Sequence, residues 1–356
     1  MKTLIITAAG LSARFEGLKP KWMLTHPKGD WMLVEALKGI NFDEVDKVCF
    51  GFSKQIVDKY NCYEAILLCI DQLGIREKTE IVYLNKQTKN QPETVYEVVK
   101  QFDIKGQIII KEIDNYFKCN IEDGNYMCYY DLNNTVKINP SNKSYITIEN
   151  NIITDIVEKK VVSSTFGCGS YSFADANEYC KYFEDLSNWS KNDKNLFLSD
   201  IIKKMIENGI EFKPYEVEDY IDWGTKEDWF SYVRKYKTLF IDLDGTLVKS
   251  SGKHTSPYWG ETEAIKENVD FINKLYDTSK VYIIITTARD KSAKEVTLQQ
   301  LKREGIKYHD IILGLPHSNR TVINDFGTSS PYPTCDAVNI VRDSRELERF
   351  LKDLGQ

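Results

Sequence analysis

The sequence predicts two α/β domains in succession. Strand-like and helix-like segments alternate from the first residues, and the alternation restarts near residue 237. A length of 356 residues is also long for a single hydrophobic core, which favours two domains independently of the pattern. We therefore expect one domain over residues 1–236 and a second, smaller one over 237–356.

The first domain is expected to be an α/β core with a β-rich insertion. Its predicted strands are short apolar runs at residues 4–6, 47–52, 80–84 and 107–110. Apolar residues at helical spacing predict helices over 56–73, 93–102 and 198–208. Between residues 126 and 158, short apolar runs alternate with Asn, Asp and Gly turns, which is typical of a β-rich segment.

The second domain begins with a predicted strand at 238–241, followed by a helix at 264–276 and a strand at 281–285. The strand at 281–285 is almost entirely β-branched, which suits a central parallel strand covered on both faces.

Composition narrows the classes of partner. The net charge is −6 with both signs interspersed, so we expect neither nucleic acid nor an anionic membrane as a partner. No apolar stretch reaches the roughly 18 residues of a membrane span, and the start is not a signal peptide. The eight cysteines lie mostly in apolar runs without zinc-ligand spacing, so reduced thiols and a cytoplasmic location are expected. The sequence is compatible with a homo-oligomer but does not specify one.

A turn of small residues follows the first predicted strand, where Ala8, Ala9 and Gly10 lead toward Arg14 and Lys21. Small side chains let backbone amides come close to phosphate oxygens, and the two cations add positive charge. A glycine turn alone is weak evidence, but its combination with the downstream Pro-Lys pair is a better indication of a phosphate site.

The A-G-x-x-x-R-F start and the later P-K pair resemble the nucleotidyltransferases of the sugar-nucleotide pyrophosphorylase superfamily over about residues 1–230. The resemblance implies a GT-A-like, Rossmann-like fold. It also implies that Ala9, Gly10 and Arg14 hold a nucleoside triphosphate and that Lys21 stabilises charge at its α-phosphate.

The same resemblance assigns two Mg²⁺ ligands, Asp114 after the strand at 107–110 and Asp222 in a late D-x-G-T-like segment. Two carboxylates from distant segments that meet at one ion are what a nucleotide–Mg²⁺ complex requires.

Two further segments match the regions of this family that contact the acceptor and the base. Lys159 lies in the Glu-Lys-Lys run that matches the acceptor-phosphate region. Residues 88–94, which include Gln91, match the base-recognition stretch, and Asn90 can adopt left-handed backbone geometry where the family has glycine. The Ala-Ala-Gly opening most resembles cytidylyltransferases, which implies CTP as the nucleotide.

The second domain carries Asp242-Leu243-Asp244 at the end of its first predicted strand. Strand side chains repeat with period two, so both carboxylates are expected on the same side, at the edge of the sheet where parallel sheets bind ligands.

This D-x-D-G-T segment resembles the first motif of the haloacid dehalogenase (HAD) phosphatases, and the resemblance covers about residues 237–342. It implies Asp242 as nucleophile and Mg²⁺ ligand, and Asp244 as general acid–base whose carbonyl helps to hold Mg²⁺. It also implies that Thr287 donates a hydrogen bond to the phosphoryl group. Asp325, at the end of a predicted strand over 321–325, would be the remaining Mg²⁺ ligand.

Two features depart from the HAD pattern. The third-motif lysine is missing, and Arg320 is the candidate substitute because a guanidinium can bridge two anionic oxygens. Only about 30 residues separate the second motif from Arg320, too few for a large cap domain, so the loop at 250–261 is the candidate cover.

The sequence therefore predicts a bifunctional enzyme. One domain would make a nucleoside-diphosphate-activated small molecule, for a bacterial capsule or surface glycan by family analogy. The other would hydrolyse a phosphomonoester of the same route. The alternatives are a phosphatase joined to a non-catalytic glycosyltransferase-like domain, or a sensor or scaffold that only binds a phosphorylated metabolite.

Overall fold

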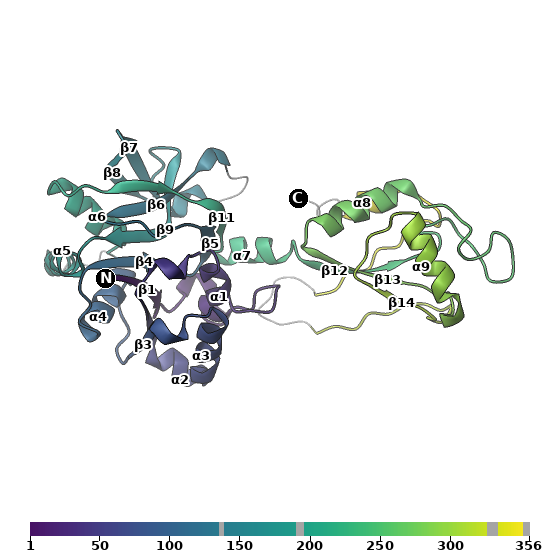
Figure 1. Cartoon of the computed structure of the whole chain (residues 1–356), viewed down its shortest axis with the longest axis horizontal. Coiled ribbons are helices and arrows are strands. Elements are labelled where there is room, and N and C mark those ends of the chain that lie inside the picture. The colour runs from purple at the N-terminus through teal and green to yellow at the C-terminus, as the bar shows by residue number, and fades with distance from the viewer. Residues whose placement is uncertain (135–138, 190–195, 326–333, 352–356) are drawn as a thin grey trace. The chain divides into compact units, whose positions relative to one another are not determined.

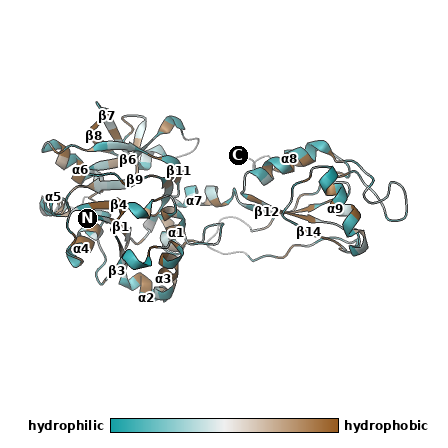
Figure 2. Cartoon of the chain, in the orientation of Figure 1, coloured by the Kyte–Doolittle hydropathy of each residue, from teal (hydrophilic) through white to brown (hydrophobic). Residues whose placement is uncertain are grey.

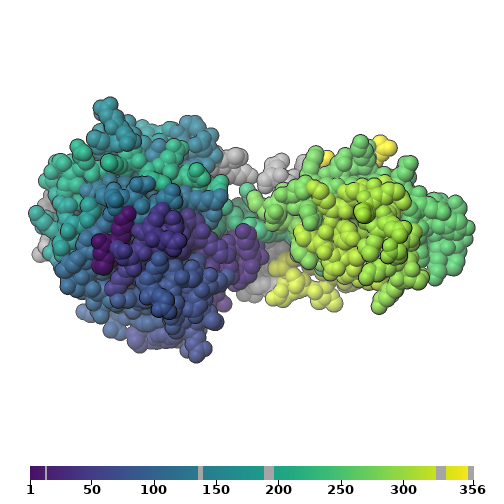
Figure 3. Space-filling model, in the orientation of Figure 1, coloured from purple at the N-terminus to yellow at the C-terminus, as the bar shows by residue number. Residues whose placement is uncertain are grey.

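The computed structural model describes residues 1–134, 139–189, 196–325 and 334–351. The chain divides into two compact units, Met1–Trp229 and a second that begins at Phe230. Each unit is a continuous stretch of chain, coloured from purple to teal-green and from green to yellow (Figure 3). The division falls inside helix α7 (Lys226–Val233) rather than after residue 236.

The described residues of the first unit form a nine-stranded sheet (Figure 1). Seven of its strands follow the order β10-β6-β9-β4-β1-β2-β3, and the other two are β7, which pairs with β9, and β8, which pairs with β7. Strand β1 runs parallel to β2 and β4, whereas β9 runs antiparallel to β4 and β6. The strands are β1 (Lys2–Ala8), β2 (Lys47–Ser53), β3 (Thr79–Leu84), β4 (Gln107–Lys111), β6 (Tyr126–Asp131), β7 (Ser144–Glu149), β8 (Ile152–Glu158), β9 (Thr165–Phe173) and β10 (Lys213–Glu216).

The helices of this unit are α1 (Met32–Leu37), α2 (Lys54–Tyr60), α3 (Tyr63–Gln72), α4 (Gln91–Gln101), α5 (Ala176–Trp189) and α6 (Leu198–Glu207). The single helix predicted over 56–73 is therefore wrong. Asn61 has left-handed backbone angles (φ 46°) and its N–H donates to Asp58 O at 3.1 Å, which ends α2. The apolar spacing continues across this break because both helices bury one face.

The core of the first unit lies on both faces of β4, all of whose residues are buried. Ile108, Ile109 and Ile110 are fully buried, and β1 and β4 are the apolar centre of the sheet (Figure 2). Parallel pairing of β1 with β4 brings the carboxyl ends of both strands to one edge.

A separate two-stranded ladder completes that edge. Strands β5 (Asn115–Lys118) and β11 (Glu218–Asp222) pair antiparallel, with Asp222 opposite Asn115. This pairing brings the end of the first unit back to the end of β4.

The second unit contains, in its described residues, the parallel strands β12 (Lys237–Asp242), β13 (Val281–Thr286) and β14 (Asp310–Ile312). Its helices are α8 (Lys266–Asp277), α9 (Lys294–Arg303) and α10 (Leu347–Leu351). Strand β13 is central, as predicted, but its two faces are buried to different extents. Ile283 and Ile285 are fully buried, whereas Tyr282 is 48% exposed.

The predicted strand over 321–325 does not form. The segment has no strand geometry and Ile323 is 93% exposed. Its β-branched residues favour extended backbone, but a strand needs a paired neighbour, and no described residue forms a ladder with it.

No helix in the described ranges is long and apolar enough to cross a bilayer. Seven of the cysteines are buried free thiols and Cys335 is exposed.

Candidate functional site

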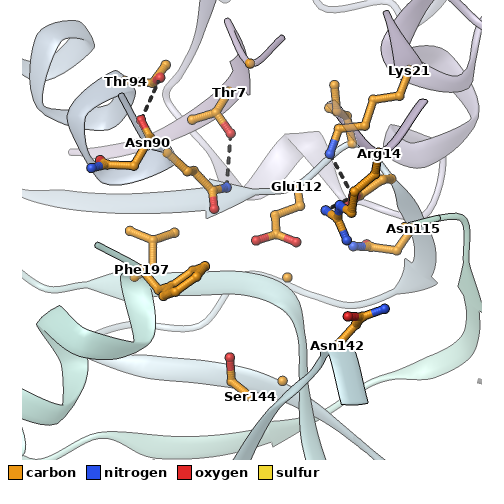
Figure 4. A pocket seen from close by; sticks show the side chains of 18 of the residues that line it. Thr7, Arg14, Lys21, Asn90, Thr94, Glu112, Asn115, Asn142, Ser144 and Phe197 are labelled. Atoms are coloured by element: carbon orange, nitrogen blue, oxygen red, sulfur yellow. Dashed lines mark hydrogen bonds and ion pairs between the residues drawn. The ribbon is translucent and has the colours of Figure 1, made fainter. Parts of the chain in front are cut away.

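A cavity of about 600 Å³ opens at the carboxyl ends of β1 and β4 in the first unit (Figure 4). The turn after β1, the loop after β4 and the start of α4 line one side. The residues before β7, the end of β8, α6 and the end of β11 line the other. Most lining side chains are polar or charged, as expected of a site for phosphorylated molecules.

The turn after β1 is tied to Lys21. Ser12 has left-handed backbone angles (φ 53°), and its Oγ accepts a hydrogen bond from Lys21 N at 3.0 Å. Gly10, Arg14 and Lys21 all line the cavity. Ala9 does not line it, because Ala9 is buried and its carbonyl accepts from Gln87 Nε2 at 2.8 Å.

Asp114 forms ion pairs with two of these residues, Lys21 and Arg14. Its Oδ2 lies 2.7 Å from Lys21 Nζ and 3.6 Å from Arg14 Nη2. Burial alone would raise the pKa of this carboxyl, but the charges of Lys21 and Arg14 outweigh burial and hold the pKa below its usual range. Asp114 is therefore ionised at neutral pH.

Asp222 lies beside Asp114, as the resemblance implied. Trp223 N donates to Asp114 O at 2.8 Å, which fixes the two segments together. A β-carbon placed on Gly224 would lie 3.1 Å from Asp222 Oδ1 and 3.8 Å from Asp114 Oδ2. Both carboxylates thus border one small space that a larger residue at position 224 would crowd.

Lys143 was not predicted from the sequence. Its Nζ lies 2.6 Å from Asp222 Oδ2 and 2.8 Å from the Tyr220 hydroxyl, and 5.8 Å from the centroid of the Phe166 ring. Lys143 precedes β7 in a polar segment without a motif, and its partner is defined only by the fold.

The two carboxylates fit a Mg²⁺ ion of the kind that nucleotidyl transfer uses. Among the described residues no three His, Cys, Asp or Glu side chains form a metal cluster. Mg²⁺ commonly takes only one or two carboxylates and completes its octahedron with phosphate oxygens and water. Asp114 and Asp222 meet that requirement, and an ion there competes with the ammonium groups of Lys21 and Lys143.

The segment expected to contact the base forms the start of α4. Gln91 lines the cavity and its Nε2 donates to Thr7 Oγ1 at 3.1 Å. Asn90 does not adopt the left-handed geometry that is open to an asparagine, because its backbone is extended (φ −153°). Its Oδ1 instead accepts from Glu93 N at 2.9 Å, since asparagine is a good cap for a helix N-terminus.

The opposite wall contains the segment expected to hold the acceptor. Lys159 lines the cavity, with its Nζ 4.3 Å from the centroid of the Phe197 ring. Glu158 Oε2 accepts hydrogen bonds from Ser144 Oγ and, at 2.7 Å, from Ser199 Oγ. Glu112, a second residue missed by sequence reasoning, points into the cavity between the two walls (Figure 4).

In the second unit, Asp242 is the last residue of β12 and pairs in register with Thr286, and Thr287 directly follows the adjacent strand β13. Asp244 is held by Arg289, whose Nε and Nη2 each donate to one of its oxygens at 2.8 Å. Arg289 is 1% exposed and was not assigned a role from the sequence. Thr287 Oγ1 lies 3.4 Å from Asp244 Oδ2, so Asp244 and Thr287 are brought together.

Arg320, the predicted substitute for the missing lysine, lies 3.0 Å from Asp242 Oδ1. Burial raises the pKa of Asp242, and the contact with Arg320 opposes that rise. The loop expected to cover the site reaches it through Ser251, whose hydroxyl donates to Asp244 Oδ1 at 2.7 Å.

The structure does not bring Asp325 into this site. Asp325 is exposed on the segment without strand geometry, and no described contact joins it to Asp242 or Asp244. The acidic residue beside the Asp-x-Asp turn is Asp343, whose N–H donates to Gly245 O at 2.8 Å. Its Oδ1 accepts from Ser250 N at 2.7 Å.

A polar cavity at the carboxyl ends of the parallel strands β4, β1, β2 and β3, within a mixed sheet, defines the first unit as a Rossmann-like α/β domain. No family model and no curated protein sequence matches the chain. Solved structures do match it, across 66% of its length.

One is a nucleoside-diphosphate-sugar pyrophosphorylase from Vibrio cholerae RC9, with a TM-score of 0.54 and 18% identity over 100% of that chain. Another is assigned as a glucose-1-phosphate thymidylyltransferase from Bacillus anthracis, with a TM-score of 0.51 and 15% identity over 94% of that chain. A UDP-glucose pyrophosphorylase in complex with UDP-glucose has a TM-score of 0.50 and 15% identity over 97% of that chain. At these identities the likeness establishes the fold. The nucleotidyltransferase-like fold of the N-terminal part is confirmed, and the HAD-like fold of the second unit stays a prediction.

Proposed function

We propose that the first unit transfers a nucleotidyl group from a nucleoside triphosphate, CTP, to a small phosphorylated sugar, polyol or amine. The observation that supports this is the convergence of Lys21, Asp114 and Asp222 in one cavity beside the glycine turn. The fold shared with pyrophosphorylases is consistent with the same reaction class.

In this reaction an acceptor phosphate oxygen attacks the α-phosphorus in line, and the bond to the oxygen that bridges to the β-phosphorus breaks. Pyrophosphate leaves with that electron pair. Lys21 and Arg14 offset the negative charge that develops on the α-phosphoryl oxygens. Mg²⁺ held by Asp114 and Asp222 would add charge neutralisation at the triphosphate. Lys159 is the candidate ligand of the acceptor phosphate and Gln91 of the base.

For the second unit we propose hydrolysis of a phosphomonoester. Asp242 attacks phosphorus and forms an aspartyl-phosphate, while Asp244 donates a proton to the leaving ester oxygen. Water, deprotonated by Asp244, then releases phosphate and restores Asp242. Arg320 lies 3.0 Å from Asp242, which supports its role in offsetting phosphoryl charge. Mg²⁺ at this site would be held by Asp242 and the Asp244 carbonyl; Asp325 lies on an exposed segment and is left out.

The two reactions fit one route only if they act on different phosphates, because removal of the phosphate that becomes nucleotidylated would waste the acceptor. We therefore propose that the second unit acts on a bisphosphate or an upstream precursor. Activated precursors of a bacterial capsule or surface glycan, made in the cytoplasm, are the proposed product class.

Separate variants test the two activities. The four ribonucleoside triphosphates are incubated with a panel of sugar, polyol and amino-alcohol phosphates and pyrophosphate release is measured, while phosphate release is measured from an aryl phosphate. Lys21→Ala should abolish only the first activity and Asp242→Asn only the second. Loss of both activities in either variant contradicts independent sites. Nucleotide binding without pyrophosphate release from any combination supports a glycosyltransferase-like or sensor domain instead.

A further inference from the structure

Glu112 is a carboxylate of the cavity that the proposed reaction does not use. It follows β4 directly, two residues before Asp114, and its side chain points from the loop into the cavity toward the wall that carries Asn142 and Ser144 (Figure 4). The intervening Ile113 is 1% exposed and anchors the loop in the core.

The other carboxylates that line the cavity each have a partner. Asp114 pairs with Lys21 and Asp222 with Lys143. The remaining two accept hydrogen bonds from hydroxyl groups, Glu158 from two serines and Asp228 from Thr225 Oγ1 at 2.6 Å. Within the described residues, the Glu112 carboxyl neither accepts a hydrogen bond nor forms an ion pair.

The backbone around Glu112 is nevertheless rigidly held. The buried Lys111 Nζ donates to Glu112 O at 2.6 Å and to Asn115 O and Oδ1 at 3.1 and 2.6 Å. Glu112 N donates to Gly169 O at 2.8 Å. A β-carbon on Gly169 would lie 2.5 Å from Glu112 Oε2, so the absence of a side chain there makes room for the carboxyl. The unpartnered group is thus positioned by its surroundings rather than mobile on the surface.

A carboxylate that is partly withdrawn from water and lacks a partner is costly, and the cost is recovered when a ligand supplies one. A hydroxyl group would donate a hydrogen bond but leave the negative charge in place. An ammonium group would supply both a donor and the opposite charge.

A phosphorylated acceptor brings further negative charge toward the same carboxylate. That repulsion disfavours an acceptor whose other groups are neutral, and it is offset if the molecule also carries a cation.

We propose that Glu112 binds a protonated amine of the acceptor, so that the acceptor of the first unit is a phosphate ester that also carries an amino group. This inference rests on the proposed nucleotidyl transfer and names its substrate class. Lys159, on the opposite wall, would then bind the phosphate end of the same molecule.

The test compares pairs of phosphate esters that differ only by an amine in place of a hydroxyl. Suitable pairs are 2-aminoethyl phosphate with 2-hydroxyethyl phosphate, and glucosamine 1-phosphate with glucose 1-phosphate. Pyrophosphate release with the preferred nucleotide gives kcat/KM for each ester. In the full-length wild-type chain the amino ester should be favoured by at least about tenfold, the order of one charge-assisted contact. In Glu112→Gln the ratio should fall to about one.

Glu97→Gln is the matched control, because Glu97 is an exposed carboxylate on α4 outside the cavity, and its ratio should equal that of the wild type. Turnover without preference for amines, or a preference retained in Glu112→Gln, overturns this inference and leaves nucleotidyl transfer intact. Absence of pyrophosphate release with every acceptor overturns both.

Discussion

The stability of the first unit in acid should depend on one buried histidine, His26. Its ring is 1% exposed and lies 5.7 and 6.2 Å, centroid to centroid, from the rings of Trp223 and Trp229. Its Nδ1 accepts from Lys28 N at 3.2 Å. Burial lowers the pKa of His26 from 6.5 to about 4, although the nearby Glu35 raises it.

The direction in which pH changes the stability follows from proton linkage. The pKa is lower in the folded than in the unfolded state, so the unfolded state binds the proton first as pH falls. The stability contributed by neutral His26 is therefore complete above the unfolded value of 6.5 and is lost progressively toward the folded value near 4. The loss amounts to roughly 1 kcal/mol at pH 5.5 and roughly 2–3 kcal/mol at pH 4.5.

The assay compares wild type with His26→Asn, which keeps an acceptor near Nδ1 but does not titrate. Urea unfolding is followed by tryptophan fluorescence at about pH 7.5, 5.5 and 4.5, because Trp223 and Trp229 pack beside His26 and against each other. The stability difference between the two proteins should narrow on acidification by the amounts above, since other titrating groups are common to both. An unchanged difference across the three pH values would refute the reasoning.

Three other substitutions have outcomes that the structure specifies. Lys111→Met removes a buried ammonium group that donates to three acceptors. The free energy of unfolding of the first unit, measured by urea titration, should fall by about 2–4 kcal/mol. An unchanged free energy would contradict the hydrogen bonds to the cavity loop. Arg289→Gln removes the two bonds that hold Asp244. It should lower the free energy of unfolding of the second unit by about 3 kcal/mol, and a stability equal to that of wild type in a thermal melt would show that Asp244 does not need its partner. Gly169→Ala adds a carbon 2.5 Å from Glu112 Oε2 at a residue with φ 83°. It should weaken acceptor binding at least about tenfold in calorimetry while nucleotide binding is kept, and equal loss of both would point to general damage.

Local sequence signals predicted the features that depend on neighbours in the chain. The apolar runs of β1 and β4 and the glycine turn after β1 were found because a buried strand and its turn are both encoded within a few residues. The proximity of Asp114 to Asp222 was implied by family resemblance alone, since the β5–β11 pairing that produces it joins residues distant in sequence.

The roles that were missed belong to residues whose partners are chosen by the fold. The sequence assigned no role to Lys143, Glu112 or Arg289. Their surroundings are visible only in the fold, where they lie beside Asp222, in the cavity and beside Asp244. A charged residue in a sequence does not reveal whether it faces water or a buried partner.

The errors have a common origin in competing local preferences. Asn61 and Asn90 are both asparagines near helix ends, yet one adopts left-handed backbone and the other caps a helix with its side chain. The β-branched segment at 321–325 has the composition of a strand but no ladder partner among the described residues. The residue types are compatible with either local structure in each case, and tertiary contacts decide which one forms.

The hydrogen bond from Trp223 N to Asp114 O has a consequence for protein synthesis. A nascent chain that has already emerged with Asp114, Lys21 and Arg14 still lacks the segment carrying Asp222 until nearly the whole first unit has left the ribosome. Under the proposed function, affinity for a nucleotide–Mg²⁺ complex should therefore arise late and abruptly during translation, and a fragment that stops before residue 222 should have only one of the two carboxylates in place.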